Sequence, residues 1–217
     1  MSELTLPQLI AVAALPILFA ITVHEVAHGW VAKQLGDPTA ERMGRLTLNP
    51  IKHIDPVGTV LVPVLLLLTA GVAIGWAKPV PVTWENLRRP KRDMALVALA
   101  GPASNLIMAI LWGVAIKLAI NLPPSAIWLA QPLAHMAQWG ILINILLMVF
   151  NLLPIPPLDG GRVAVGLLPR SLGWQLGRLE PYGFFIIIGL MMTGVLWFMI
   201  NPMRLAVQRF VAWLVGL

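Results

Sequence analysis

His24, Glu25 and His28 form the pattern H-E-x-x-H inside an apolar segment of the chain. Two histidines four residues apart lie on one face of an α-helix, where both imidazoles can bind one Zn²⁺. A glutamate between them can take a proton from a metal-bound water molecule. Residues 6–23, which precede the pattern, carry no charge. Because charged groups are costly in a bilayer, the pattern predicts a functional metal site within a membrane-spanning helix.

A simpler interpretation is that these histidines are buried residues whose hydrogen bonds are satisfied within the core. Short patterns such as this one recur by chance. Two of the four histidines in the chain fall within this one pattern, however. An unused carboxylate buried beside them would cost free energy. The metal interpretation is therefore favoured.

The composition predicts an all-α polytopic membrane protein. Apolar residues make up 59% of the 217 residues and charged residues 11%, and the mean hydropathy is +0.84. The length suits a single domain over 1–217, with a catalytic core at about 4–165 and an additional span and interfacial tail at 182–217. The basic residues are scattered over loops, so no nucleic-acid partner is expected. The absence of cysteine excludes disulfides, thiolate metal ligands and a thiol nucleophile.

The apolar segments predict a helical bundle with a three-span core, formed by residues 4–35, 94–120 and 127–153. A fourth span is expected over 182–200, followed by an interfacial helix over 203–217. The apolar run 57–77 is interrupted by Pro63 and by glycines near its end. Residues 78–82, here called the proline strip, contain Pro79 and Pro81, which exclude a helix and favour an extended backbone.

A catalytic zinc needs a third protein ligand and one open position. Asp159 is the best-placed candidate, because it follows a span that prolines end and precedes two glycines that leave room for close approach. An aspartate that merely caps the next helix remains an equally simple reading of this position. The other candidates are His53, Asp55, His135 and Glu180.

Three motifs together resemble the site-2 protease family of intramembrane zinc metalloproteases. They are H-E-V-A-H at 24–28, G-P-A-S-N at 101–105 and N-L-L-P-I-P-P-L-D-G-G-R at 151–162. The resemblance implies one Zn²⁺ per chain, held by His24, His28 and Asp159, with Glu25 as the general base. It also implies that Asn151 is a polar group near the site, and that Pro79, Val80, Pro81 and Val82 belong to a segment that receives an unwound substrate strand.

Other polar residues are expected to support the site without binding the metal. Asn105 can form a hydrogen bond across helices to Asn144 or Asn151, because polar side chains join membrane helices. His53 is expected to have a structural role in its loop or to lie near the metal ligands without binding the metal. Residues 47–76 are an insertion relative to the shortest family members. Val31 and Gln34 stand where a metzincin would have glycine and a third histidine, so that alternative fails.

The shared metal constrains the topology, because the spans that end after His28 and before Asp159 must exit on one side. The 57–77 run must then re-enter or lie embedded, since a full crossing would put Asp159 on the opposite side. Twelve of the 15 basic residues lie in 33–55, 78–93 and 159–180, and 121–135 contains none. The re-entrant arrangement places these twelve on one side, as the positive-inside rule requires.

The sequence thus predicts an intramembrane zinc metalloprotease that cleaves a membrane-anchored protein in or near its transmembrane segment. A bacterial plasma membrane is the location that the resemblance implies. The alternatives are a membrane metal-ion transporter and a non-catalytic scaffold. A transporter would need several carboxylates along a path, whereas only Glu25 and Asp159 are available in the apolar segments. The sequence does not indicate an oligomeric state.

Overall fold

The structure is a computed structural model that describes residues 4–62, 64–65, 68, 75 and 77–217. Within these residues every regular element is helical. The main helices are α1 (Leu6–Gln34), α4 (Pro90–Ile120), α5 (Ile127–Asn151), α6 (Asp159–Leu167), α7 (Arg170–Gly177), α8 (Gly183–Met192) and α9 (Val195–Val215). The shorter ones are α2 (Thr39–Arg42), η1 (Pro50–His53), η2 (Pro56–Leu61), η3 (Trp84–Asn86), η4 (Pro124–Ala126) and η5 (Glu180–Tyr182). The three helices α1, α4 and α5 are long and apolar enough to cross a membrane. The protein is an all-α polytopic membrane protein, as predicted.

The helix ends follow from local sequence. At the start of α1, the Thr5 backbone N–H donates to the side chain of Gln8, and the helix ends before Gly36, whose φ of +114° favours glycine. The α4 helix begins at Pro90, four residues before the predicted start. Proline is favoured in a first helical turn, and the Asp93 carboxylate accepts the Arg89 backbone N–H at 2.8 Å.

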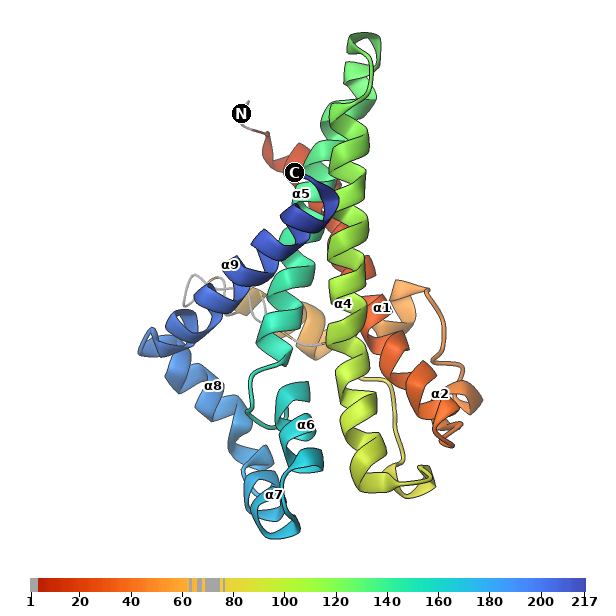
Figure 1. Cartoon of the computed structure of the whole chain (residues 1–217), viewed down its shortest axis with the longest axis vertical. Helices are drawn as coiled ribbons and strands as arrows, with labels where there is room; N and C mark the ends of the chain where they lie inside the picture. The colour runs from red at the N-terminus through yellow and green to blue at the C-terminus, as the bar shows by residue number, and fades with distance from the viewer. Residues whose placement is uncertain (1–3, 63, 66–67, 69–74, 76) are drawn as a thin grey trace.

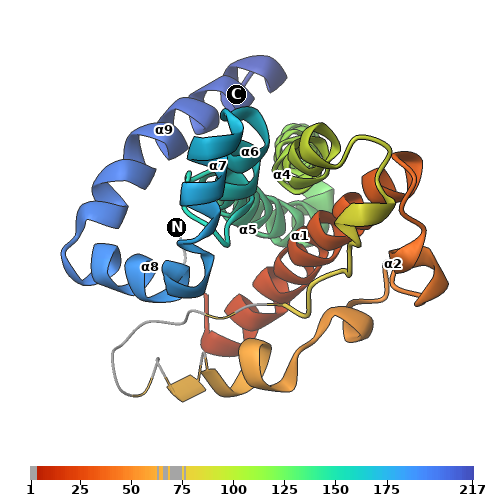
Figure 2. The same ribbon diagram turned by 90° about the horizontal axis from the view of Figure 1, so that it is seen from below.

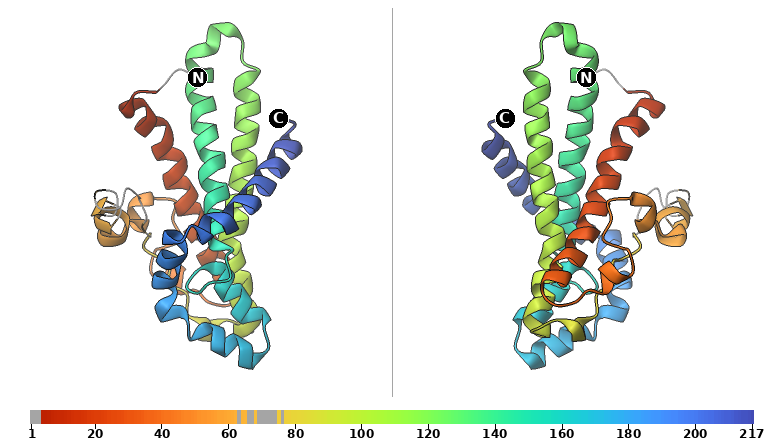
Figure 3. Two further views of the ribbon diagram at one scale, coloured as in Figure 1. Left: turned by 90° about the vertical axis from the view of Figure 1, so that its left-hand side faces the viewer. Right: turned by 90° about the vertical axis from the view of Figure 1, so that its right-hand side faces the viewer.

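The α1, α4 and α5 helices pack into the central bundle (Figure 1). The α4 and α5 helices form a long hairpin, and the turn between them lies at the end of the molecule away from α6 and α7 (Figure 3). The ends of α1 and α5 lie toward the same end of the bundle at which α4 begins (Figure 1). This arrangement satisfies the requirement that the segments carrying His28 and Asp159 exit together.

The chain leaves the bundle at His53 and returns to the same place at Lys78. The Lys78 backbone N–H donates to the His53 carbonyl at 2.9 Å. A segment whose two ends are joined by a hydrogen bond makes no net crossing, which agrees with the predicted re-entrant or embedded path. Of the predicted 57–77 segment, residues 63, 66–67, 69–74 and 76 lie outside the described residues.

The span predicted over 182–200 is not one continuous helix. The chain turns at Gly194, whose φ of +76° is left-handed, and the helical segments Arg170–Met192 and Val195–Val215 meet at 85°. The predicted interfacial helix over 203–217 is also not separate, because α9 runs from Val195 to Val215. Figure 2 shows α8 and α9 along the side of the bundle. The Lys117 ammonium donates to the Val215 carbonyl at 2.7 Å, joining α9 to α4.

Candidate active site

Three potential metal-ligating atoms converge inside the bundle: Nε2 of His24, Nε2 of His28 and Oδ2 of Asp159. The two Nε2 atoms are 3.1 Å apart, and Asp159 Oδ2 lies 3.2 Å from that of His24 and 3.4 Å from that of His28. Ligand atoms held about 2.1 Å from a tetrahedral zinc ion lie about 3.4 Å from one another. The triangle formed by the three side chains therefore has the size of one face of a zinc coordination tetrahedron.

Hydrogen bonds on the far side of each imidazole direct its lone pair into this triangle. His24 Nδ1 lies 2.6 Å from the Asn105 side-chain oxygen, and His28 Nδ1 lies 2.7 Å from the Val97 carbonyl. Both partners can only accept, so each Nδ1 carries the hydrogen and each Nε2 is left with a lone pair. Asp159 Oδ2 is buried and has no hydrogen-bond donor among the described residues. Three electron-rich atoms facing one another fit a shared cation.

The local sequence explains how Asp159 reaches α1. Asp159 is the first residue of α6, directly after the proline-rich turn that follows α5. A Cβ atom built on Gly160 would collide with the Leu152 and Leu153 carbonyls, and one on Gly161 would collide with backbone atoms of the same turn. Only glycine allows the start of α6 to pack this closely against the end of α5.

Gly101 of α4 provides the space beside the two histidines. A Cβ atom built on Gly101 would lie 2.6 Å from His24 Nε2 and would also overlap His28 Nε2. The two imidazoles therefore occupy the volume that any other residue at position 101 would fill. This glycine is the first residue of the G-P-A-S-N motif, and the close approach of the two imidazoles explains why the motif has glycine at that position in this chain.

A chain of buried polar side chains supports His24. The Asn105 amide donates to the Ala20 carbonyl at 3.2 Å and to Asn144 Oδ1 at 2.9 Å, which joins α4 to α1 and α5. Asn144 in turn donates to the Gly140 carbonyl at 2.8 Å. Of the two partners predicted for Asn105, Asn144 is the one in contact. The Asn151 side chain instead donates to the Leu147 carbonyl of its own helix at 3.0 Å.

Glu25 faces the proline strip. One residue along a helix is a rotation of about 100°, so Glu25 lies on a different face from His24. Its Oε2 atom accepts the Val80 backbone N–H at 2.8 Å. One turn later, a Cβ atom on Gly29 would lie 2.7 Å from the Val80 side chain. The strip thus runs along the Glu25–Gly29 face of α1.

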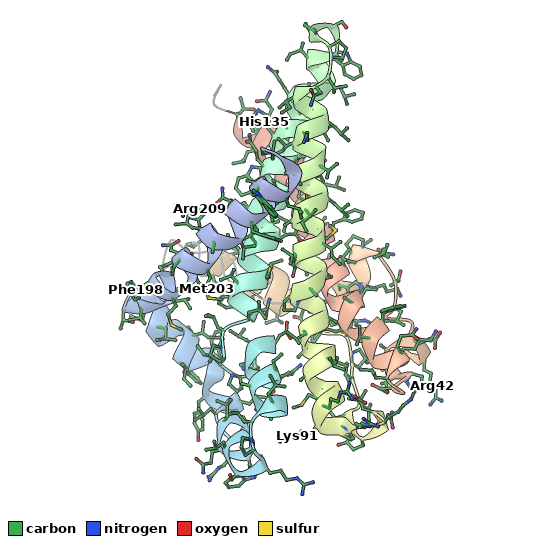
Figure 4. All side chains as sticks on the ribbon, in the orientation of Figure 1. Arg42, Lys91, His135, Phe198, Met203 and Arg209 are labelled. Atoms are coloured by element: carbon green, nitrogen blue, oxygen red, sulfur yellow. The ribbon has the colours of Figure 1, made fainter. Side chains whose placement is uncertain are left out.

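The other candidate ligands have different partners. Asp55 caps η2 by accepting the Val57 and Gly58 backbone N–H groups, and Glu180 lies 3.5 Å from Arg162. His53 is 2% exposed, and its Nε2 lies 2.9 Å from the Thr47 carbonyl. His135 lies on α5 toward the end of the bundle away from α6 (Figure 4). Within the described part of the chain, only His24, His28 and Asp159 form a group that could hold a metal.

Two residues that sequence reasoning missed hold the ends of the proline strip. Asp37 accepts hydrogen bonds from the Thr83 backbone N–H at 2.7 Å and from the Asn86 amide at 3.0 Å. Burial alone would raise the pKa of Asp37, but these bonds and those from Thr39 hold that pKa below its usual range. Arg45 donates to the Lys78 carbonyl at 2.9 Å. The only sequence signals were an aspartate in a G-D-P turn and an arginine directly after a glycine.

Comparison with known proteins identifies the family. The model of peptidase family M50 matches residues 113–193. The chain is 40% identical over 194 residues to YwhC of Bacillus subtilis, covering 87% of this chain and 85% of that protein. It is 34% identical over 190 residues to Rip2 of Mycolicibacterium smegmatis, covering 83% of this chain and 67% of that protein. The names of both relatives describe zinc metalloproteases. No solved structure matches. The chain therefore belongs to peptidase family M50, the site-2 protease family, and is an intramembrane zinc metalloprotease.

Proposed function

We propose that His24, His28 and Asp159 bind the catalytic zinc and that Glu25 is the general base. The observation that carries this proposal is the convergence of the three ligand atoms within 3.4 Å of one another, on two buried side chains and the partly buried His28. When bound, zinc activates a water molecule and polarises the scissile carbonyl group. The chain's own contribution is to hold three ligands on α1 and α6 and to leave the remaining coordination position open.

Glu25 would move the proton. Its carboxylate lies one residue after the first ligand and accepts a hydrogen bond from the Val80 backbone N–H. In the proposed reaction Glu25 takes a proton from the attacking water and passes it to the nitrogen of the leaving amine. The adjacent ligand and the Val80 amide both restrict the position of the carboxylate.

The proline strip would receive the substrate in an extended conformation. The carbonyl groups of a transmembrane helix are bound in its own i→i−4 hydrogen bonds, so a substrate must unwind before hydrolysis. Pro79 and Pro81 have no N–H and keep the strip out of helix, while Val80 carries an N–H directed at Glu25. A substrate strand that pairs with the strip would thus lie beside the proposed base.

The proposed substrate is a membrane-anchored protein that is cut in or near its transmembrane segment. The metal-ligating atoms lie between α1, α4 and α6, and two of these helices are long and apolar enough to cross a membrane. The proposed location is a bacterial plasma membrane, because the relatives that match are bacterial. Residues 1–217 would form one catalytic domain.

Fragment analysis in cells tests the proposal. Quantitative proteomics of membrane-protein fragments should compare cells that express the wild-type enzyme with cells that express Glu25→Gln. Glu85→Gln, at an exposed position on η3, is the matched control. The proposal expects a set of fragments that occurs with the wild type and the control and is absent with Glu25→Gln. The same fragments with all three enzymes would contradict it.

A further inference from the structure

Arg45 is a buried cation outside the proposed metal and base residues. It is 8% exposed, and it follows α2 at a point where the chain turns at Gly44, whose φ is +63°. The guanidinium donates to the Lys78 carbonyl at 2.9 Å and reaches the Pro79 carbonyl at 3.5 Å. Because an unsolvated charge is costly, a buried arginine needs such acceptors. Here the acceptors are the first two carbonyls of the proline strip.

The strip is held at points on both sides of Val80. Lys78 donates its N–H to the His53 carbonyl and accepts from Arg45, and the Thr83 N–H after the strip donates to Asp37. In an extended chain, alternate residues direct their backbone groups to the same edge. Fixing Lys78 therefore also fixes which edge the Val80 amide presents.

The two prolines make this register a strict requirement. Pro79 and Pro81 flank Val80, and neither has an N–H. A slip of the strip by one residue in either direction would place a proline opposite Glu25 and leave its carboxylate without the amide donor. Of the three residues 79–81, only Val80 can donate the hydrogen bond that Glu25 accepts at 2.8 Å.

We infer that Arg45 is a positioning residue, which clamps the Lys78 carbonyl and so keeps the Val80 amide in register with Glu25. The inference rests on the proposed roles of Glu25 and the proline strip. Among the described residues, the hydrogen bonds of the Arg45 side chain go to the strip and not to the metal ligands or Glu25. Its effect on proteolysis passes through the strip, and its loss should change both substrate binding and the orientation of the base.

Hydrogen–deuterium exchange of the purified full-length protein in detergent micelles measures how firmly Arg45 holds the proline strip, and it needs no activity assay. Arg45→Gln removes the charge and the Nη2 donor, and Arg45→Lys restores a cation without the planar guanidinium. Arg42→Gln is the matched control, because Arg42 is exposed and lies in the same segment (Figure 4). We expect exchange in the peptide that covers the strip to be about tenfold faster in Arg45→Gln. Arg45→Lys should be intermediate and Arg42→Gln unchanged, while the α5 peptides stay protected in all three.

Kinetics on a purified reporter with one apolar span, a Gly-Pro break in that span and a tag at each end give the second measurement. We expect Arg45→Gln to lower kcat/KM about tenfold, with a higher KM and with zinc content unchanged. A purely structural defect would lower kcat through the fraction of folded enzyme and leave KM as it is. Unchanged strip exchange, or equally faster exchange in every peptide, would overturn the inference.

The result for Glu25→Gln separates this inference from the proposed function. If Glu25→Gln cleaves the reporter like the wild type while Arg45→Gln still speeds exchange of the strip, Glu25 is not the base but Arg45 does position the strip. If Glu25→Gln is inactive but strip exchange and KM in Arg45→Gln match those of the wild type, the role of Glu25 is supported and the positioning role of Arg45 is contradicted.

Discussion

The Nδ1 atom of His24 on α1 lies 2.6 Å from the side-chain oxygen of Asn105 on α4. Asn105 is fully buried, and its amide group is bound by Ala20 and Asn144. The oxygen of Asn105 is therefore fixed as an acceptor, and it fixes the tautomer of His24 in turn. One buried asparagine thus connects all three spans of the core to a proposed zinc ligand.

Replacing Asn105 should weaken zinc binding. Asn105→Leu removes the acceptor that orients His24 and leaves Asn144 Oδ1 without its donor. We expect zinc affinity to fall about tenfold or more, the range found when partners of metal-bound histidines are removed. Competition with a chelator measures the affinity. Asn121→Leu, at the exposed end of α4, is the matched control. Equal zinc affinity in the two variants would show that Asn105 does not support zinc binding.

Adding one methyl group at Gly101 should disrupt the metal group. The Cβ atom of Gly101→Ala would overlap the Nε2 atoms of His24 and His28, so the imidazoles must move apart. We expect zinc content to fall well below one ion per chain. Gly189→Ala in α8 serves as the control, because no atom outside its own helix turn lies within 4 Å of the added Cβ. Elemental analysis of both purified variants measures the difference, and full zinc content in Gly101→Ala contradicts the packing argument.

Asp37 should stabilise the protein in a pH-dependent way. Its pKa is lower in the folded state, so its contribution is present above the ordinary aspartate pKa and is lost as the pH falls through the folded value. Asp37→Asn should lower the free energy of unfolding at pH 7 by about 2 kcal/mol, because charged hydrogen bonds are lost. The difference from the wild type should shrink below about pH 4. Unfolding in mixed micelles measures both values. Glu85→Gln, at an exposed position, should show neither effect.

Cysteine labelling tests the topology. The Asn86 amide lies 3.4 Å from Thr39 Oγ1, so these residues must share one side of the membrane. Because the chain contains no cysteine, single cysteines at Thr39, Asn86 and Ser171 can be labelled with an impermeant maleimide without background. All three should label from the cytoplasmic face and Ser125 only from the other, in line with the distribution of basic residues. Labelling of positions 39 and 86 from opposite faces would exclude the re-entrant arrangement.

The sequence was sufficient to predict the fold class and the pair of converging histidines, because each has a strong local signal. The H-E-x-x-H spacing predicts two histidines on one helix face, whereas Asp159 was one of five candidates for the third ligand, and the resemblance to the family is what singles it out. The shared metal then fixed the relative direction of α1 and α5. The return of the chain from His53 to Lys78 agrees with that argument.

Contacts that depend on packing between helices could not be predicted in the same way. Nothing in the sequence indicates that Asn105 bonds Asn144 and not Asn151. Both asparagines lie on the same predicted span, about two helical turns apart, and so they share one helix face. The acceptor for His28 Nδ1 is the backbone carbonyl of Val97, and a backbone group cannot be recognised from the type of its side chain. The break at Gly194 was missed because an apolar run that contains one glycine still matches the pattern of a span.

Zinc content across a matched set of purified variants tests the central claim most directly. The account predicts one zinc per chain in the wild type, in Glu25→Gln and in His53→Ala, because the proposed ligands are intact in all three. It predicts loss of zinc in His24→Ala and Asp159→Ala, because each removes one of three converging atoms. Retention of zinc in Asp159→Ala together with its loss in His53→Ala would contradict the proposed ligand set.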